Sequence, residues 1–79
     1  MALVRLQIEV DEDQLKDMES LMQECGIRTK KDLINNAYTI FKWAVKKRKE
    51  GCEIAAVDSV NNRFIELDMP ALSSVQKQR

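Results

Sequence analysis

The feature that most constrains this chain is the alternation of apolar and polar residues at its start, in the stretch VRLQIEV at residues 4–10. Four apolar side chains fall on one face, and Arg5, Gln7 and Glu9 fall on the other. This period of two predicts a β-strand with one buried face, which we place at residues 3–10. A single strand cannot satisfy its own backbone hydrogen-bonding groups, so it needs a second strand.

Two helices are predicted directly after the strand, over residues 12–25 and 30–50. The first begins with a capping pattern, because the carboxylate of Asp11 can accept a hydrogen bond from a free amide in the first turn. Gly26 ends this helix, since glycine readily adopts the left-handed conformation that closes many helices. Thr29 is the expected N-cap of the second helix.

The second helix has a wider apolar face than the first helix can cover. Its apolar side chains span an arc of about 160°, and Trp43 extends that arc to about 220°. A chain of 79 residues also buries too little surface to form a robust core by itself. Both observations indicate that a partner chain completes the fold.

The C-terminal part of the chain has the pattern of a β-hairpin extension, over residues 52–72. The β-prone runs 54–57 and 64–67 flank a turn that is rich in Asp, Ser and Asn. A short loop between the two runs places Asp58 opposite Arg63, where their charges can pair across the strands.

The hairpin extension follows a first domain of residues 1–51 and leads into a tail. An isolated hairpin is only marginally stable, so we expect it to pack on the helices, with Trp43 as a contact. Residues 69–72 are expected to be extended, because Pro70 disfavours a helix before it. The polar residues 73–79 are expected to form a disordered tail.

The net charge of the whole chain is zero, but the charged residues are unevenly distributed along it. Residues 1–28 hold three basic and seven acidic side chains, a net charge of −4. Residues 29–51 hold seven basic and two acidic side chains, a net charge of +5. The zero total argues against indiscriminate nucleic-acid binding, but the basic segment can form a local anion-binding surface.

The residue types that are missing exclude several kinds of chemistry. The chain has no His, which excludes zinc sites of the Cys/His type. Cys25 and Cys52 have no CxxC spacing and are expected to be buried free thiols. Without a His base or a Gly-rich phosphate loop, we expect no enzyme activity and no cofactor. No apolar run is long enough for a membrane span or a secretion signal, so a soluble cytoplasmic protein is expected.

The strand at residues 3–10 has two possible partners. One is the C-terminal hairpin, which would give a three-stranded sheet within one chain. The other is the same strand of a second chain, which would give an antiparallel ribbon between two copies. The second option explains more, because the second copy also covers the wide apolar face of the helix at 30–50.

Residues from about 3 to 51 resemble the ribbon-helix-helix family of DNA-binding repressors and antitoxins. The resemblance is carried by the strand VRLQIEV, the helix start DEDQ, the turn CGIRTKKD and the apolar spacing of the second helix. It implies an α+β fold, mainly α, in which two chains intertwine as a homodimer around an intermolecular two-stranded antiparallel ribbon. In this family the ribbon enters the major groove of double-stranded DNA. The short members of the family lack the C-terminal hairpin.

The resemblance also assigns residues to DNA. The outward side chains of the strand face the bases, where Arg can chelate guanine and Gln can chelate adenine. Glu9 can accept from cytosine, or it can pair with Arg5 of the second chain if the two-fold axis passes through Gln7. The start of the second helix faces phosphates through free amides and basic side chains. The implied base contacts are Arg5, Gln7 and Glu9, and the implied phosphate contacts are Arg28, Thr29, Lys30 and Lys31.

The expected function is therefore a sequence-specific, repressor-like transcriptional regulator that acts as a homodimer. The alternative is a protein-interaction module, an antitoxin or adaptor with little or no DNA binding, that uses the C-terminal hairpin. Trp43 and Phe64 are the expected partner surface in that case. The strand-turn-helix order favours the regulator, whereas the zero net charge and Glu9 favour the interaction module.

Overall fold

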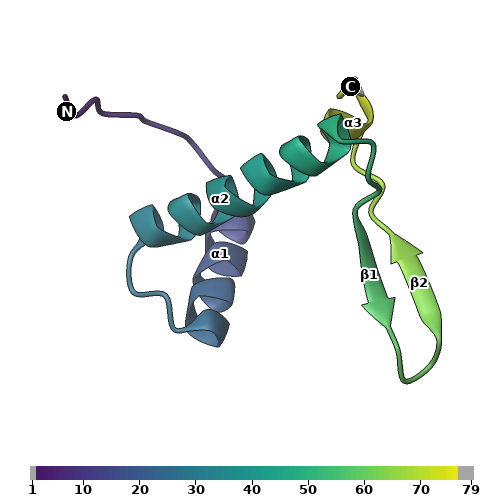
Figure 1. The fold of residues 1–79 in the computed structure, drawn as a ribbon. Coiled ribbons are helices and arrows are strands. Elements are labelled where there is room, and N and C mark those ends of the chain that lie inside the picture. Colours follow the sequence, from purple (N-terminus) through teal and green to yellow (C-terminus); the bar gives the residue numbers. More distant parts are fainter. Residues whose placement is uncertain (1, 77–79) are drawn as a thin grey trace. The chain divides into compact units, whose positions relative to one another are not determined.

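The computed structural model describes residues 2–76 and contains three helices and two strands within them (Figure 1). These residues form a helix-rich α+β protein with one two-stranded antiparallel sheet, as the sequence predicts at this level. No helix within them is long and apolar enough to cross a membrane. The elements in chain order are α1 (Glu12–Cys25), α2 (Lys30–Lys49), β1 (Ala55–Asp58), β2 (Arg63–Glu66) and α3 (Pro70–Ser73).

The chain divides into two compact units, one ending at Ile34 and the other beginning at Asn35. The division falls inside α2, so the first turn of this helix belongs to the first unit. The domain boundary after residue 51 therefore stays a prediction.

Helix α1 begins and ends where the sequence predicts, because both of its caps form. The backbone N–H of Gln14 donates to Asp11 Oδ1 at 2.7 Å. At the other end, Gly26 has φ of +68°, and the N–H of Ile27 donates to the carbonyl oxygen of Met22 at 2.8 Å. This bond is the six-to-one contact of a Schellman motif, so local side-chain chemistry fixes the length of α1.

Helix α2 also has the N-cap that the sequence predicts. The N–H of Asp32 donates to Thr29 Oγ1 at 3.1 Å. The helix ends at Lys49, one residue before the predicted end, and Gly51 with φ of +90° follows it. Four basic residues lie in the last turn, where they complement the negative end of the helix dipole.

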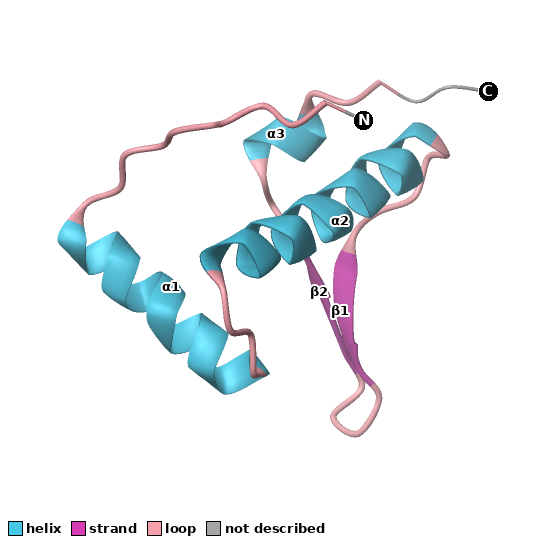
Figure 2. Ribbon diagram, turned by 90° about the vertical axis from the view of Figure 1, so that its left-hand side faces the viewer, coloured by secondary structure: helices cyan, strands magenta, loops and turns pink. Residues whose placement is uncertain are grey.

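Residues 2–10 have no regular secondary structure in the single chain, and Figure 2 draws them as a loop that leads into α1. The sheet of the described residues contains only β1 and β2. The three-stranded sheet within one chain, considered above as an alternative, is therefore wrong. The ribbon between two copies stays a prediction, because a strand of that kind forms only when a second chain pairs with it.

The hairpin has the register that the sequence predicts. Asp58 is the partner of Arg63 in the antiparallel pair, and Ala56 is the partner of Ile65. The turn is held by Asp58, whose Oδ1 accepts from the N–H of Asn61 at 3.2 Å. Asp58 Oδ2 lies 3.4 Å from Arg63 Nη2, which closes the turn with an ion pair.

The prediction of an extended segment at residues 69–72 is wrong, because a short helix begins at Pro70. Met69 is extended, as the residue before proline should be, but proline then occupies the first helical position, which it tolerates well. Ser73 is the last residue of α3, and the N–H of Ser74 donates to Pro70 O at 3.1 Å. The predicted tail at 73–79 is therefore wrong at its start, and residues 77–79 lie outside the described chain.

The interior of the described chain is small. Three of its hydrophobic side chains are buried, and the exposed fractions are 9% for Met22, 5% for Ala44 and 3% for Leu72. In the second unit, α3 contacts the last turn of α2, where Arg48 Nε donates to Leu72 O (Figure 1). Both free thiols, Cys25 and Cys52, are exposed, so their predicted burial is wrong. With three buried hydrophobic side chains in the described residues, the interior is too small to include the two thiols as well.

Candidate nucleic-acid interface

The start of α2 presents backbone amides and three basic side chains together. Thr29 caps the helix through its hydroxyl, and its carbonyl oxygen accepts from the N–H of Leu33 at 3.1 Å. The amides of Lys30 and Lys31 come before the first bonds within the helix, so they point out of its N-terminus. Backbone amides in this position and the positive end of the helix dipole together favour an anion.

The basic side chains at this helix start are available to a ligand. Arg28, Lys30 and Lys31 are all exposed. Within the described chain, the ion pairs are formed by Lys47, Arg48 and Arg63, and not by these three residues. The predicted phosphate-contacting residues are therefore solvent-accessible and adjacent to one another in sequence.

The N-terminal segment keeps the alternation that the sequence shows, although it forms no strand. Its even-numbered residues Leu6, Ile8 and Val10 line a groove of about 230 Å³ in the first unit, and the predicted base-contacting residues do not. The other lining residues are Leu15 and Met18 of α1 and Lys30, Lys31 and Ile34 of α2. This groove brings the predicted strand to the basic start of α2.

The groove leaves the segment's apolar side chains largely uncovered. Leu6 is 81% exposed, Ile8 is 65% exposed and Val10 is 39% exposed. Arg5, Gln7 and Glu9 are exposed as well. Three large apolar side chains that face helices without being buried by them form a surface that a further segment can cover.

The two residues of the predicted partner surface are exposed but lie in different settings. Trp43 is 51% exposed and lines a groove of about 630 Å³ that is formed by residues of α2 alone. Phe64 is 66% exposed and pairs with Val57 across the hairpin. Phe64 is not among the residues that line the Trp43 groove.

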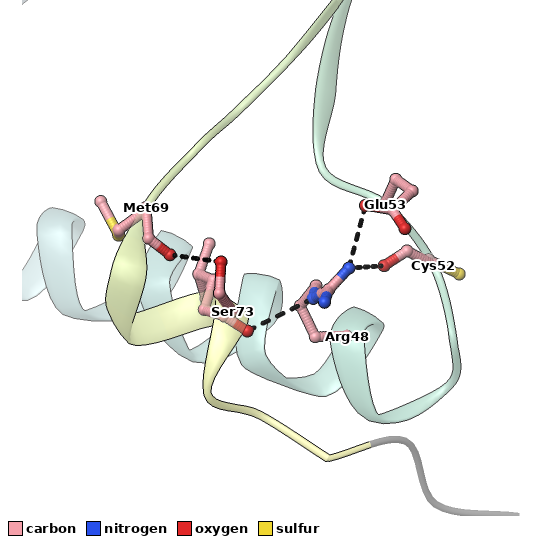
Figure 3. Close-up of polar contacts among 6 residues, drawn as sticks. Arg48, Cys52, Glu53, Met69 and Ser73 are labelled. Atoms are coloured by element: carbon pink, nitrogen blue, oxygen red, sulfur yellow. Dashed lines mark hydrogen bonds and ion pairs between the residues drawn. The ribbon is translucent and has the colours of Figure 1, made fainter.

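Sequence reasoning missed the role of Arg48, which joins three segments of the second unit. Its Nη1 lies 2.9 Å from Glu53 Oε2 and donates to Cys52 O at 3.4 Å, while its Nε donates to Leu72 O at 3.3 Å (Figure 3). Arg48 belongs to a run of four basic residues, which the helix dipole alone explains. Its contact with α3 depends on a helix that the sequence did not predict.

Acidic side chains gather beside Arg48, around a cavity of about 380 Å³ at the base of the hairpin. A hydrogen bond with Glu53 and the negative charge of that residue raise the pKa of Glu66 above its ordinary value, with a further contribution from Asp68. Arg48 opposes this shift but does not cancel it. The base of the hairpin is therefore a site where negative charge is only partly compensated.

The turn of the hairpin has the opposite electrostatic character. Hydrogen bonds from the side chain and backbone of Asn61 lower the pKa of Asp58, and Arg63 lowers it further. Across the described residues, no group of three or more His, Cys, Asp or Glu residues is arranged to hold a metal ion.

No protein-family model, curated protein or solved structure matches this chain. Its function is therefore inferred from its own residues and their geometry.

Proposed function

We propose that this chain is a sequence-specific DNA-binding transcriptional regulator of the ribbon-helix-helix kind, acting as a repressor-like dimer. The observation that carries the proposal is the groove in the first unit, in which an alternating segment lies next to a capped, basic helix start. The two predicted DNA-binding parts are thereby neighbours on one compact unit.

In the proposed dimer, the segments at residues 3–10 of two copies pair as an antiparallel ribbon. Their apolar side chains then face the helices from both copies, which covers the surface that is exposed in the single chain. Arg5, Gln7 and Glu9 lie on the outer face of the ribbon, in reach of base edges in the major groove. The amides at the start of α2 and the side chains of Arg28, Lys30 and Lys31 hold phosphates on either side.

The phosphate contacts are tested with Lys31→Ala, the double variant Lys30→Ala/Lys31→Ala, and Lys16→Ala on the acidic α1 as a charge-matched control. A double-stranded fragment selected from a random pool is titrated over a range of salt concentrations. Each lost phosphate contact reduces the slope of log affinity against log salt by about one. Because the dimer carries each substitution twice, we expect a reduction of about two for Lys31→Ala, about four for the double variant and none for Lys16→Ala.

Equal slopes in all variants would contradict the phosphate role of the α2 start. The proposal of DNA binding would be overturned altogether if the selection enriched no fragment and if the affinity of the wild-type protein for double-stranded DNA did not depend on salt.

A second candidate function is a protein-interaction module, such as an antitoxin or adaptor. It is supported by the exposure of Phe64 and Val57 on the hairpin and of Trp43 on α2. This function predicts a defined complex with another protein and no salt-dependent binding to DNA, so the same titration separates the two candidates.

A further inference from the structure

The second unit carries an exposed apolar groove with a basic rim along α2. Its apolar lining comprises Tyr38, Phe41, Trp43 and Val45. Three lysines also line it, and Lys42 Nζ lies 5.9 Å from the centre of the Tyr38 ring. We call this surface the aromatic–lysine groove, which comprises Tyr38, Phe41, Lys42, Trp43, Val45, Lys46 and Lys49. Within the described chain its lysines form no ion pair.

The hairpin of the same unit carries a complementary face. In an antiparallel pair, alternate residues and their cross-strand partners share one face, and the register places Val57 opposite Phe64 and Ala55 opposite Glu66. We call this surface the Phe64 face, which comprises Ala55, Val57, Phe64 and Glu66. Val57 is 72% exposed and Phe64 is 66% exposed, so neither side chain is covered within the chain.

Few cations balance the negative charge at the Glu66 end of the Phe64 face. Glu66 shares a hydrogen bond with Glu53 and lies near Asp68, and the one cation that opposes these charges is Arg48. The Arg48 guanidinium is itself bound to Glu53, Cys52 O and Leu72 O. A further ammonium group near Glu66 would therefore be favourable.

We propose that the Phe64 face of one copy packs against the aromatic–lysine groove of a second copy. The apolar side chains of Val57 and Phe64 pack against the apolar residues of the groove, and the lysines of the groove approach Glu66. Charge and apolar character thus match on the two surfaces, and the contact supports a hairpin that is marginal when it stands alone. Each copy carries both surfaces, so a two-fold pair makes the contact twice. This contact goes beyond the proposed DNA binding and does not depend on it.

The contact is tested with two charge reversals, Lys46→Glu in the groove and Glu66→Lys on the hairpin. Lys47→Glu is the matched control, because Lys47 neighbours Lys46 but does not line the groove. Trp43 is the single tryptophan of the chain, so quenching of its fluorescence by acrylamide reports directly on the groove. The full-length variants are measured over a range of protein concentrations, with the mass in solution measured in parallel by light scattering.

In the wild-type protein, Trp43 should become protected as the concentration rises. Each charge reversal should raise the concentration needed for this protection by about tenfold, and Lys47→Glu should leave it unchanged. An equal mixture of Lys46→Glu and Glu66→Lys should recover protection, because the reversed groove of one variant then meets the reversed hairpin of the other. This recovery cannot arise from variants that merely fail to fold.

Equal Trp43 protection in all variants, or no recovery in the mixture, would overturn the hairpin–groove contact. Trp43 that stays accessible in the wild-type protein at every concentration would overturn it too. The DNA titration described above is independent of these readouts, so salt-dependent DNA binding without hairpin–groove contact leaves the proposed function standing.

Discussion

Single residues at helix ends account for the parts of this structure that follow most directly from the sequence. Asp11 and Thr29 each accept from the backbone N–H three residues later, and Gly26 adopts a positive φ after α1. These contacts join residues that are close in the sequence, so the identity of the capping residue is enough to predict them.

Gly26 allows a clean test of this local control. A Cβ atom built at Gly26 would meet no atom within 4 Å, so a side chain there is opposed by backbone conformation alone. We expect Gly26→Ala to lower the free energy of unfolding by about 1 kcal/mol, because L-residues disfavour the left-handed region. Gly26→Asn should lose less, since Asn visits that region more readily. Urea unfolding followed by circular dichroism measures both, and equal losses would contradict the explanation.

The hairpin and the elements around it illustrate the element scale. Turn chemistry and strand alternation predicted the pairing of Asp58 with Arg63, and the structure confirms it. The base of the hairpin was not predictable in the same way. Arg48 binds Leu72 O across 24 residues of sequence, and this bond requires both the end of α2 and the short helix α3 to be in place.

Glu66 and Asp58 of the hairpin should make the stability of the folded protein depend on pH in opposite directions. The pKa of Glu66 is raised in the folded protein, so folding is favoured below the ordinary value of 4.5 and this contribution is lost as pH rises through the folded pKa. The pKa of Asp58 is lowered, so its contribution is present above the ordinary value of 3.8 and is lost as pH falls through the folded pKa.

At protein concentrations too low for the hairpin–groove contact, Glu66→Gln should therefore stabilise the single chain at pH 7 and have little effect at pH 3. Asp58→Asn should destabilise it at pH 7, because the side chain loses its charge-assisted bonds with Asn61 and Arg63. Urea unfolding followed by Trp43 fluorescence between pH 3 and pH 8 measures both effects. Destabilisation by Glu66→Gln at pH 7 would mean that Arg48 dominates the charge balance at the hairpin base.

At the scale of the whole molecule, the main fact is how much apolar surface a single copy exposes. Leu6 and Ile8 line a groove of the first unit yet stay 81% and 65% exposed, and Tyr38 and Trp43 are exposed in the second unit. A chain with this surface is expected to associate, since burial of apolar area is the dominant favourable term in protein association. The proposed ribbon covers Leu6 and Ile8, and the proposed hairpin–groove contact covers Tyr38 and Trp43.

The ribbon is tested by comparing neighbouring residues on its two faces, Ile8→Ser and Gln7→Ser. Burial of an Ile side chain contributes about 1.5–3 kcal/mol, and the dimer contains two copies of it. Ile8→Ser should therefore raise the dissociation constant of the dimer by about a hundredfold or more. Gln7→Ser should keep the dimer and weaken the selected DNA complex. Light scattering over a dilution series, with both substitutions made in the Glu66→Lys variant to weaken the hairpin–groove contact, measures the dimer, and an unchanged mass for Ile8→Ser would contradict the ribbon.

The sequence by itself determined the local features of this protein: the bounds of α1, the start of α2 and the register of β1 and β2. Each depends on hydrogen bonds between near neighbours or on a period of two, which the order of residues encodes directly. The basic helix start and the alternating segment of the candidate site were predicted in the same way.

The tertiary structure decided which of these features lie together. It placed Leu6, Ile8 and Val10 beside Lys30 and Lys31, and it left Trp43 in a groove formed by α2 alone. In the structure, residues 70–73 also form a helix, and the carbonyl oxygen of Leu72 in this helix accepts a hydrogen bond from Arg48. Contacts of this kind depend on where distant segments meet in space, and neither residue of such a pair reveals its partner by its own type or spacing.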